Sequence, residues 1–160
     1  MKRDFIDYLF LLPQVFIAAF ACYIGYQQYK TAKNKLRLDL YQRRFTVYQS
    51  ALEFYYAMIG PREFIQSDAF GIVQNNFIKS YRESQFLFGK DSGVFLILGE
   101  MHSKSFIIIN CKENNDKGVI IPSEIMNKYG DFDDALKYFN SKILVLENKI
   151  DPYLNFRKIQ

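Results

Sequence analysis

The chain begins with an apolar run that is long enough to cross a membrane. From Tyr8 to Tyr26 the sequence reads YLFLLPQVFIAAFACYIGY and contains no formally charged residue. As a helix, these residues span about 28 Å, close to the hydrocarbon thickness of about 30 Å of a bilayer. The run predicts a single transmembrane helix. Because it continues into Gln27 and Lys30 with no break in helical character, an uncleaved anchor is favoured over a signal peptide.

The residues that follow, from Tyr29 to Ile59, have helical spacing with no Pro or Gly among them. Apolar residues at alternating three- and four-residue steps form a heptad seam of Leu38, Tyr41, Phe45, Tyr48, Leu52, Tyr55 and Ile59. A second apolar row widens the stripe and consists of Leu40, Val47, Ala51, Phe54 and Met58. We therefore expect one rod, from the anchor to a stop at Gly60-Pro61, with more than one neighbour covering it.

Three more helices are expected downstream. One starts at Ser67 or Asp68 and runs to Phe88, one covers 94–110, and the last runs from 131 to a stop at Asp151-Pro152, after a short turn of helix near 122. The segment 94–110 also suits a β-hairpin, and helix is favoured. It is disfavoured as a second membrane span, because charged residues fall near its centre.

These elements predict an all-α fold. A single N-terminal transmembrane helix, within residues 1–29, continues into a long helix, and residues 30–160 form a cytoplasmic helical bundle. The excess of Lys and Arg after the run places the N-terminus outside and the C-terminal domain in the cytoplasm of a bacterial inner membrane.

One face of the predicted anchor carries small and polar residues. They recur at three- and four-residue steps and are Asp7, Gln14, Ala18, Ala21, Cys22 and Gly25. Small residues let helix backbones approach closely in lipid, and a glutamine there prefers a partner or water. The face is therefore a candidate oligomer or pore surface. The alternative is that Ala and Gly are simply common in membrane helices.

The net charge of +4 is concentrated directly after the anchor. Residues 27–44 have a net charge of +5, with Asp39 as the acid and Lys30, Lys33, Lys35, Arg37, Arg43 and Arg44 as the bases. Attraction to anionic lipid headgroups explains such a juxtamembrane segment, and this interpretation is preferred. The alternative is single-stranded nucleic acid, which the bases and the interleaved aromatics could hold by phosphate contact and stacking.

Catalytic signatures are lacking, so we expect a protein that is not an enzyme and uses no cofactor or metal. His102 has no Cys, Ser or carboxylate constellation near it in sequence, and Cys22 and Cys111 are far apart. Asp131, Asp133 and Asp134 could be imagined as metal ligands, but their place at a helix start favours capping and dipole compensation.

Three motifs resemble a group of small bacterial inner-membrane proteins. They are KLRLDLYQRRFTVY at residues 35–48, FLFG at 86–89 and PYLNF at 152–156. The pattern in that group is one N-terminal span, a KLxLxLYxRRFxVY helix and a helical cytoplasmic domain. The layout is also similar to effectors of anti-phage defence operons, including the Hailong type, in which a DNA oligomer holds a membrane channel oligomer shut. The resemblance implies nucleic-acid contact at 30–44 and a pore along the Gln14 face.

The sequence thus leaves two main hypotheses. The first is a membrane-anchored homo-oligomeric effector, a gated pore or ion channel in anti-phage defence that a nucleic acid regulates. The second is a non-catalytic anchored adaptor that recruits a partner protein, which could be encoded in the same operon. An enzyme is the least supported alternative.

Overall fold

The chain folds into helices wherever its structure is described. The computed structural model describes the backbone of residues 2–114 and 132–154, and the side chains of residues 13–113 and 132–154. The helices are α1 (Lys2–Ile59), α2 (Arg62–Ile65), α3 (Asp68–Leu87), the 3-10 turn η1 (Lys90–Ser92), α4 (Val94–Asn114) and α6 (Phe132–Leu154). These ranges contain no strand, so the predicted all-α class is confirmed.

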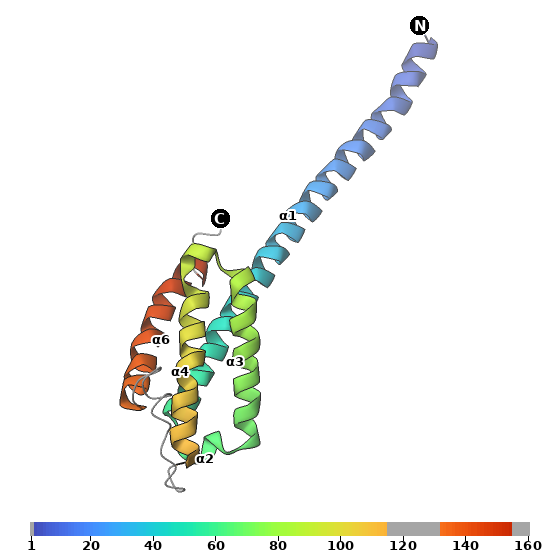
Figure 1. Ribbon diagram of the computed structural model, residues 1–160. Coiled ribbons are helices and arrows are strands. Elements are labelled where there is room, and N and C mark those ends of the chain that lie inside the picture. Colours follow the sequence, from blue (N-terminus) through green and yellow to red (C-terminus); the bar gives the residue numbers. More distant parts are fainter. Residues whose placement is uncertain (1, 115–131, 155–160) are drawn as a thin grey trace. The chain divides into compact units, whose positions relative to one another are not determined.

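The chain divides into two compact units. Unit 1 is Met1–Asp39 and contains the N-terminal part of α1, whose side chains from residue 13 onward are almost all exposed. Unit 2 is Leu40–Gln160, in which α3, α4 and α6 run beside the C-terminal part of α1 (Figure 1). Every buried side chain among residues 13–113 and 132–154 belongs to the second unit.

The core of unit 2 is built on aromatic rings from three helices. Phe54 of α1 stacks on Phe77 of α3 with ring centroids 4.1 Å apart, and Phe139 of α6 lies 6.2 Å from Phe54. All three rings are fully buried. On α1, it is the second predicted row that enters this core, through Val47, Ala51, Phe54 and Met58. The predicted heptad seam instead lies at its margin, with Tyr48, Leu52 and Tyr55 half-buried.

The end of α1 falls where the Gly-Pro pair predicts it. A Cβ at Gly60 would lie 2.9 Å from the main-chain oxygen of Tyr56, so the tight turn excludes a side chain there. Lys112 of α4 donates hydrogen bonds from Nζ to the main-chain oxygens of Met58 and Gly60, at 2.7 and 2.6 Å. A cation at the negative end of a helix dipole stabilises that end. Burial lowers the pKa of Lys112.

Helix is the correct choice for residues 94–110, and the hairpin alternative is wrong. Gly93, with φ of 73°, turns the chain into α4 in a conformation that favours glycine. The predicted stop at Asp151-Pro152 is also wrong, because α6 continues through Pro152 to Leu154. Tyr153 and Leu154 pack against the core, which outweighs the lost proline donor. The turn expected near 122 lies outside the described residues.

Among the described residues, one helical segment is long and apolar enough to cross a membrane, Val94–Glu113 of α4. It lies in mid-chain rather than at the N-terminus, and 44% of its apolar window is buried inside the protein. Val94, Leu98 and Met101 are at most 1% exposed, as expected for a core helix. The side chains of Tyr8–Leu12, which begin the predicted anchor, lie outside the described residues.

Candidate functional site

Three segments that are distant in sequence meet around Arg44 in unit 2. Arg44 of α1 donates a hydrogen bond from Nε to the main-chain oxygen of Leu87, at 2.9 Å. Its guanidinium lies 5.1 Å from the ring centroid of Tyr153 in α6 and 6.0 Å from that of Phe88. The Arg44 cluster, which is Arg44, Leu87, Phe88 and Tyr153, thus joins the RRF, FLFG and PYL pieces of the three motifs.

The Arg44 cluster has the geometry of a structural joint. The rings of Phe88 and Tyr153 meet edge to face with centroids 5.3 Å apart, and Phe88 is only 5% exposed. A planar guanidinium can donate to a carbonyl while its face covers an aromatic ring, which a lysine ammonium cannot reproduce. Contact of Arg44 with lipid or nucleic acid stays a prediction and would compete with these bonds.

Tyrosines on the heptad seam hold α1 to α6. Tyr48 donates a hydrogen bond from its hydroxyl to Glu147 Oε1 at 2.7 Å, and Tyr55 donates to Asn140 Oδ1 at 2.8 Å. The hydrogen bond to Glu147, together with burial, raises the pKa of Tyr48 to about 12. Two of the seven residues of the predicted seam, Tyr48 and Tyr55, therefore form hydrogen bonds to α6.

A second polar cluster joins α4 to α6. Tyr138 donates a hydrogen bond to Glu100, and Lys142 Nζ lies 3.8 Å from the same carboxylate. Lys104 and Lys142 lie 5.0 and 5.2 Å from the Tyr138 ring centroid. Burial and the Glu100 contact raise the pKa of Tyr138. This network pairs charged side chains of α4 with side chains of α6.

His102 lies among aromatic rings. Its ring centroid is 6.3 Å from that of Phe77, 6.0 Å from that of Tyr81 and 5.0 Å from that of Phe106. Burial, with a smaller contribution from the positive charge of Arg82, lowers the pKa of His102. Its surroundings match a packed histidine better than a general base, which needs a positioned proton donor or acceptor.

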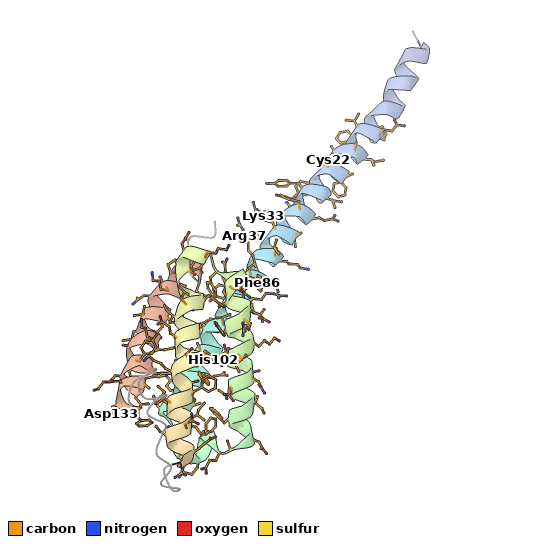
Figure 2. The ribbon with its side chains drawn as sticks, in the orientation of Figure 1. Cys22, Lys33, Arg37, Phe86, His102 and Asp133 are labelled. Atoms are coloured by element: carbon orange, nitrogen blue, oxygen red, sulfur yellow. The ribbon has the colours of Figure 1, made fainter. Side chains whose placement is uncertain are left out.

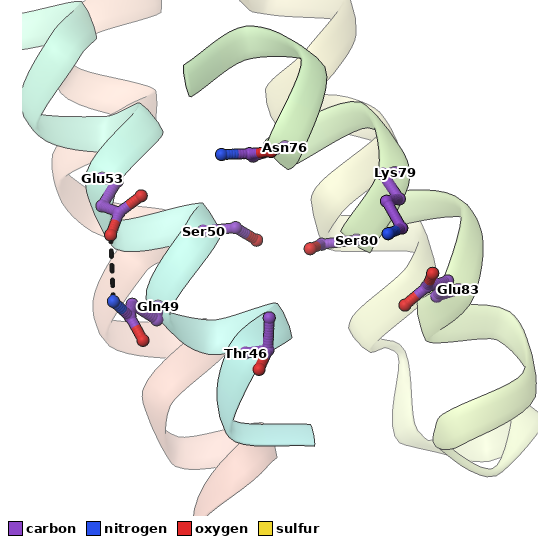
Figure 3. Close-up of a pocket in the computed structure, with 8 residues that line it drawn as sticks. All are labelled: Thr46, Gln49, Ser50, Glu53, Asn76, Lys79, Ser80 and Glu83. Atoms are coloured by element: carbon purple, nitrogen blue, oxygen red, sulfur yellow. Dashed lines mark hydrogen bonds between the residues drawn. The ribbon is translucent and has the colours of Figure 1, made fainter. Parts of the chain in front are cut away.

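A polar cleft lies between part of α1 and part of α3 in unit 2 (Figure 3). Ser50 and Ser80, each 5% exposed, point toward one another across it, and Gln49 donates a hydrogen bond to Glu53 at 3.0 Å. The cleft has a volume of about 310 Å³, and its lining residues are Thr46, Gln49, Ser50, Glu53, Asn76, Lys79, Ser80 and Glu83. Serine hydroxyls, amides and charges of both signs give it no preference for an anion or a cation.

An apolar pocket of about 390 Å³ lies at the connection between α3 and α4. Phe86, labelled in Figure 2, is 82% exposed at its rim, and Leu96 is 66% exposed. Phe88 and Phe95 also line it, with Lys90 as its charged residue. Exposed rings beside a hollow are typical of a surface that binds another apolar group.

The structure places the predicted site residues along α1. Gln14, Ala18, Ala21, Cys22 and Gly25 are exposed in unit 1, whereas the side chain of Asp7 lies outside the described residues. The bases Lys30, Lys33, Lys35 and Arg43 are exposed, and Arg37 and Arg44 are half-buried (Figure 2).

Sequence reasoning missed the polar cleft beside Ser50 and the apolar pocket beside Phe86. The only signal for the polar cleft is the run of polar residues along one face of α1, and the exposed Phe86 looks like a core residue in the sequence.

Metal-binding geometry is not found in the part of the chain that the structure describes, where no group of three or more His, Cys, Asp or Glu side chains converges. Asp133 and Asp134 lie in the first turn of α6, where negative charge stabilises the positive end of the helix dipole. Asp131 lies outside the described residues.

Comparison with protein-family models, with the curated proteins and with the solved structures found no match for this chain.

Proposed function

We propose that the chain is a membrane-anchored homo-oligomeric effector that forms a gated pore in the bacterial inner membrane. One observation carries the proposal, the exposed apolar surface of α1 in unit 1. Phe16, Ile17 and Phe20 are 73%, 69% and 64% exposed, on a helical segment against which no other element of that unit packs. Each such side chain gains roughly 1.5–3 kcal/mol on leaving water, so lipid or another chain must cover them.

The pore follows from the two sides of the same helical segment. Large apolar residues suit lipid, whereas Gln14, Ala18, Ala21 and Gly25 suit close helix contact or a wet conduit. A Cβ built on Gly25 meets nothing within 4 Å, so the glycine leaves its side of the helix open. The bases between 30 and 44 remain on the cytoplasmic side, where they bind anionic lipid or a regulatory nucleic acid.

Conductance of the purified chain in planar bilayers tests the pore. Ala18→Leu narrows the small-residue face and is expected to abolish conductance, whereas Phe16→Leu, two residues away on the opposite side of the helix, is expected to preserve it. Equal conductance of the two variants contradicts a pore along this face. In cells, overexpression of the variant that keeps its conductance should be toxic, and overexpression of Ala18→Leu should not.

The alternative function is a membrane-anchored adaptor, and the pocket beside Phe86 favours it. An adaptor needs an exposed recognition surface, which Phe86 and Leu96 provide. Phe86→Ser should then release an operon-encoded partner from the purified full chain without changing conductance. A partner that stays bound to this variant contradicts the adaptor.

A further inference from the structure

One row of side chains along α1 avoids charge over six consecutive heptads. Taking every seventh residue from 17 to 59 defines the heptad row, which is Ile17, Ile24, Thr31, Leu38, Phe45, Leu52 and Ile59. Between residues 14 and 59, each of the other six rows contains at least one charged or amide side chain. The heptad row is therefore distinct from every other line of the helix.

In unit 2, Phe45 and Ile59 of the heptad row lie outside the core, and Leu52 lies at its margin. Phe45 and Ile59 are 42% and 43% exposed, and Leu52 is half-buried. Val47 and Phe54, two positions after Phe45 and Leu52, are at most 1% exposed and lie on the opposite side of α1. Packing within unit 2 accounts for Leu52, which contacts the core at its margin, but not for the apolar character of Phe45 and Ile59.

The tyrosines of the predicted seam bind within the chain, whereas Phe45 and Ile59 of the heptad row remain exposed. Tyr48 and Tyr55 hydrogen-bond to α6, as described above. In unit 1 the row continues with Ile17, Ile24 and Leu38, which are 69%, 40% and 55% exposed. Apart from Leu52, the apolar members of the row are exposed in each unit taken by itself.

The exact seven-residue repeat indicates what binds to the heptad row. A straight helix has about 3.6 residues per turn, so a seven-residue row drifts by roughly 20° per heptad and stays on one seam only in a left-handed supercoil. Such a supercoil forms between helices that share the repeat, and this chain carries it. We propose that the heptad row binds the same row of a second copy, parallel and in register.

The neighbouring row supports self-recognition in register. Gln14, Gln28, Gln42 and Gln49 each lie three residues before a member of the heptad row, in a neighbouring row that also contains Ala21, Lys35 and Tyr56. In a parallel pair each glutamine meets its own counterpart, and an amide both donates and accepts hydrogen bonds. Polar residues at such core positions specify register and direction. The hydrogen bond of Gln49 to Glu53 lies at the surface, where it is easily exchanged.

The parallel direction rests on the proposed function, because anchors in one membrane give both copies the same direction and depth. Ala18, Gly25 and Ala32 follow the heptad row at the next position, so small side chains flank it where the copies would lie in lipid. The predicted small-residue face and the heptad row are thus two parts of one interface.

Two leucines of similar exposure provide a matched test in the full-length chain. Leu38 lies on the heptad row and is 55% exposed, whereas Leu36 lies off it and is 62% exposed. Each cysteine variant is made in a chain whose Cys22 and Cys111 are replaced by Ser. In membranes, Leu38→Cys should form disulfide-linked dimers about tenfold faster than Leu36→Cys. A disulfide needs Cα atoms about 4.4–6.8 Å apart, and the proposed interface brings the two copies of residue 38, but not of residue 36, that close. In detergent, light scattering should give a single-chain mass for Leu38→Glu and the wild-type oligomer mass for Leu36→Glu.

The outcomes separate this inference from the proposed function. An oligomeric wild type whose two cysteine variants cross-link at equal rates, or whose Leu38→Glu variant keeps its mass, overturns the heptad interface and leaves an oligomeric effector intact. A monomeric wild type in membranes and detergent overturns both. Selective cross-linking at Leu38 without conductance supports the interface and removes the pore.

Discussion

Replacing Arg44 measures how firmly the three motifs are joined. Arg44→Ala removes the hydrogen bond to the Leu87 oxygen and the contacts with the rings of Phe88 and Tyr153. A charged hydrogen bond contributes about 1.5–3 kcal/mol when buried, and each cation–π contact about 0.5–1 kcal/mol when exposed. Because Arg44 is only half-buried, we expect a total loss of about 2 kcal/mol in the free energy of unfolding.

The assay is urea unfolding of the full chain in mild detergent, monitored by circular dichroism. Thermal unfolding serves as a second measure. A loss of about 2 kcal/mol lowers the melting temperature by roughly 8 °C for a unit of this size. Arg43→Ala, at the exposed neighbouring residue, is the control and should change stability by less than about 0.5 kcal/mol. Arg44→Lys should recover less than half of the loss, because an ammonium cannot stack and donate as the planar guanidinium does.

A double-mutant cycle makes the test specific. Combining Arg44→Ala with Tyr153→Leu should cost about 1 kcal/mol less than the sum of the single changes, because both remove the same contact. Strict additivity, or an Arg44→Ala variant as stable as Arg43→Ala, would refute the reasoning that the motifs form one joint.

Three further predictions concern the fold of unit 2. Glu147 raises the pKa of Tyr48 from 10.0 to about 12, so the contribution of Tyr48 to stability is complete below pH 10 and is lost between pH 10 and 12. Over that interval the free energy of unfolding of the wild type should fall by about 1 kcal/mol more than that of Tyr48→Phe. Parallel curves of the free energy of unfolding against pH would contradict this prediction. Because burial lowers the pKa of His102 from 6.5, the free energy of unfolding should fall as the pH drops below 6.5, and this loss should be smaller in His102→Phe. Chemical denaturation at pH 7 and pH 5 measures the loss, and an equal loss in the wild type and in His102→Phe would count against the prediction. Phe54→Ala should lower the free energy of unfolding by about 3–5 kcal/mol, whereas Ile72→Ala, at an exposed residue, should lower it by less than about 1 kcal/mol. Similar melting temperatures for the two variants would rule out the aromatic core.

Local signals in the sequence were sufficient for the helices. The Gly-Pro pair after Ile59, the Ser67-Asp68 start and the aspartates at the start of α6 mark boundaries that the structure confirms within one or two residues. The stop at Pro152 failed, because packing of Tyr153 and Leu154 is a tertiary contact that a local breaker signal does not include. The short helix α2 was missed for lack of any periodicity over four residues.

The candidate sites were predicted less completely. Residues on one helical face can be found from spacing alone, which is why the Gln14 face and the basic segment are visible in the sequence. The Arg44 cluster, the cleft beside Ser50 and the pocket beside Phe86 each need two or more elements whose pairing is not encoded in local spacing. The exposed Phe86 shows the same limit, because hydrophobicity alone assigns it to a core.

By itself, the sequence determined the all-α class, the long helix α1 and its seven-residue apolar repeat, since these depend on local propensity and spacing along one helix. Only the tertiary structure decided which of the apolar rows of α1 is used internally. The row through Val47 and Phe54 enters the core, while Phe45 and Ile59 stay exposed. The physical reason is that α3, α4 and α6 can cover only part of a helix that is apolar on more than one side, and the face they leave open is the one available to a second copy.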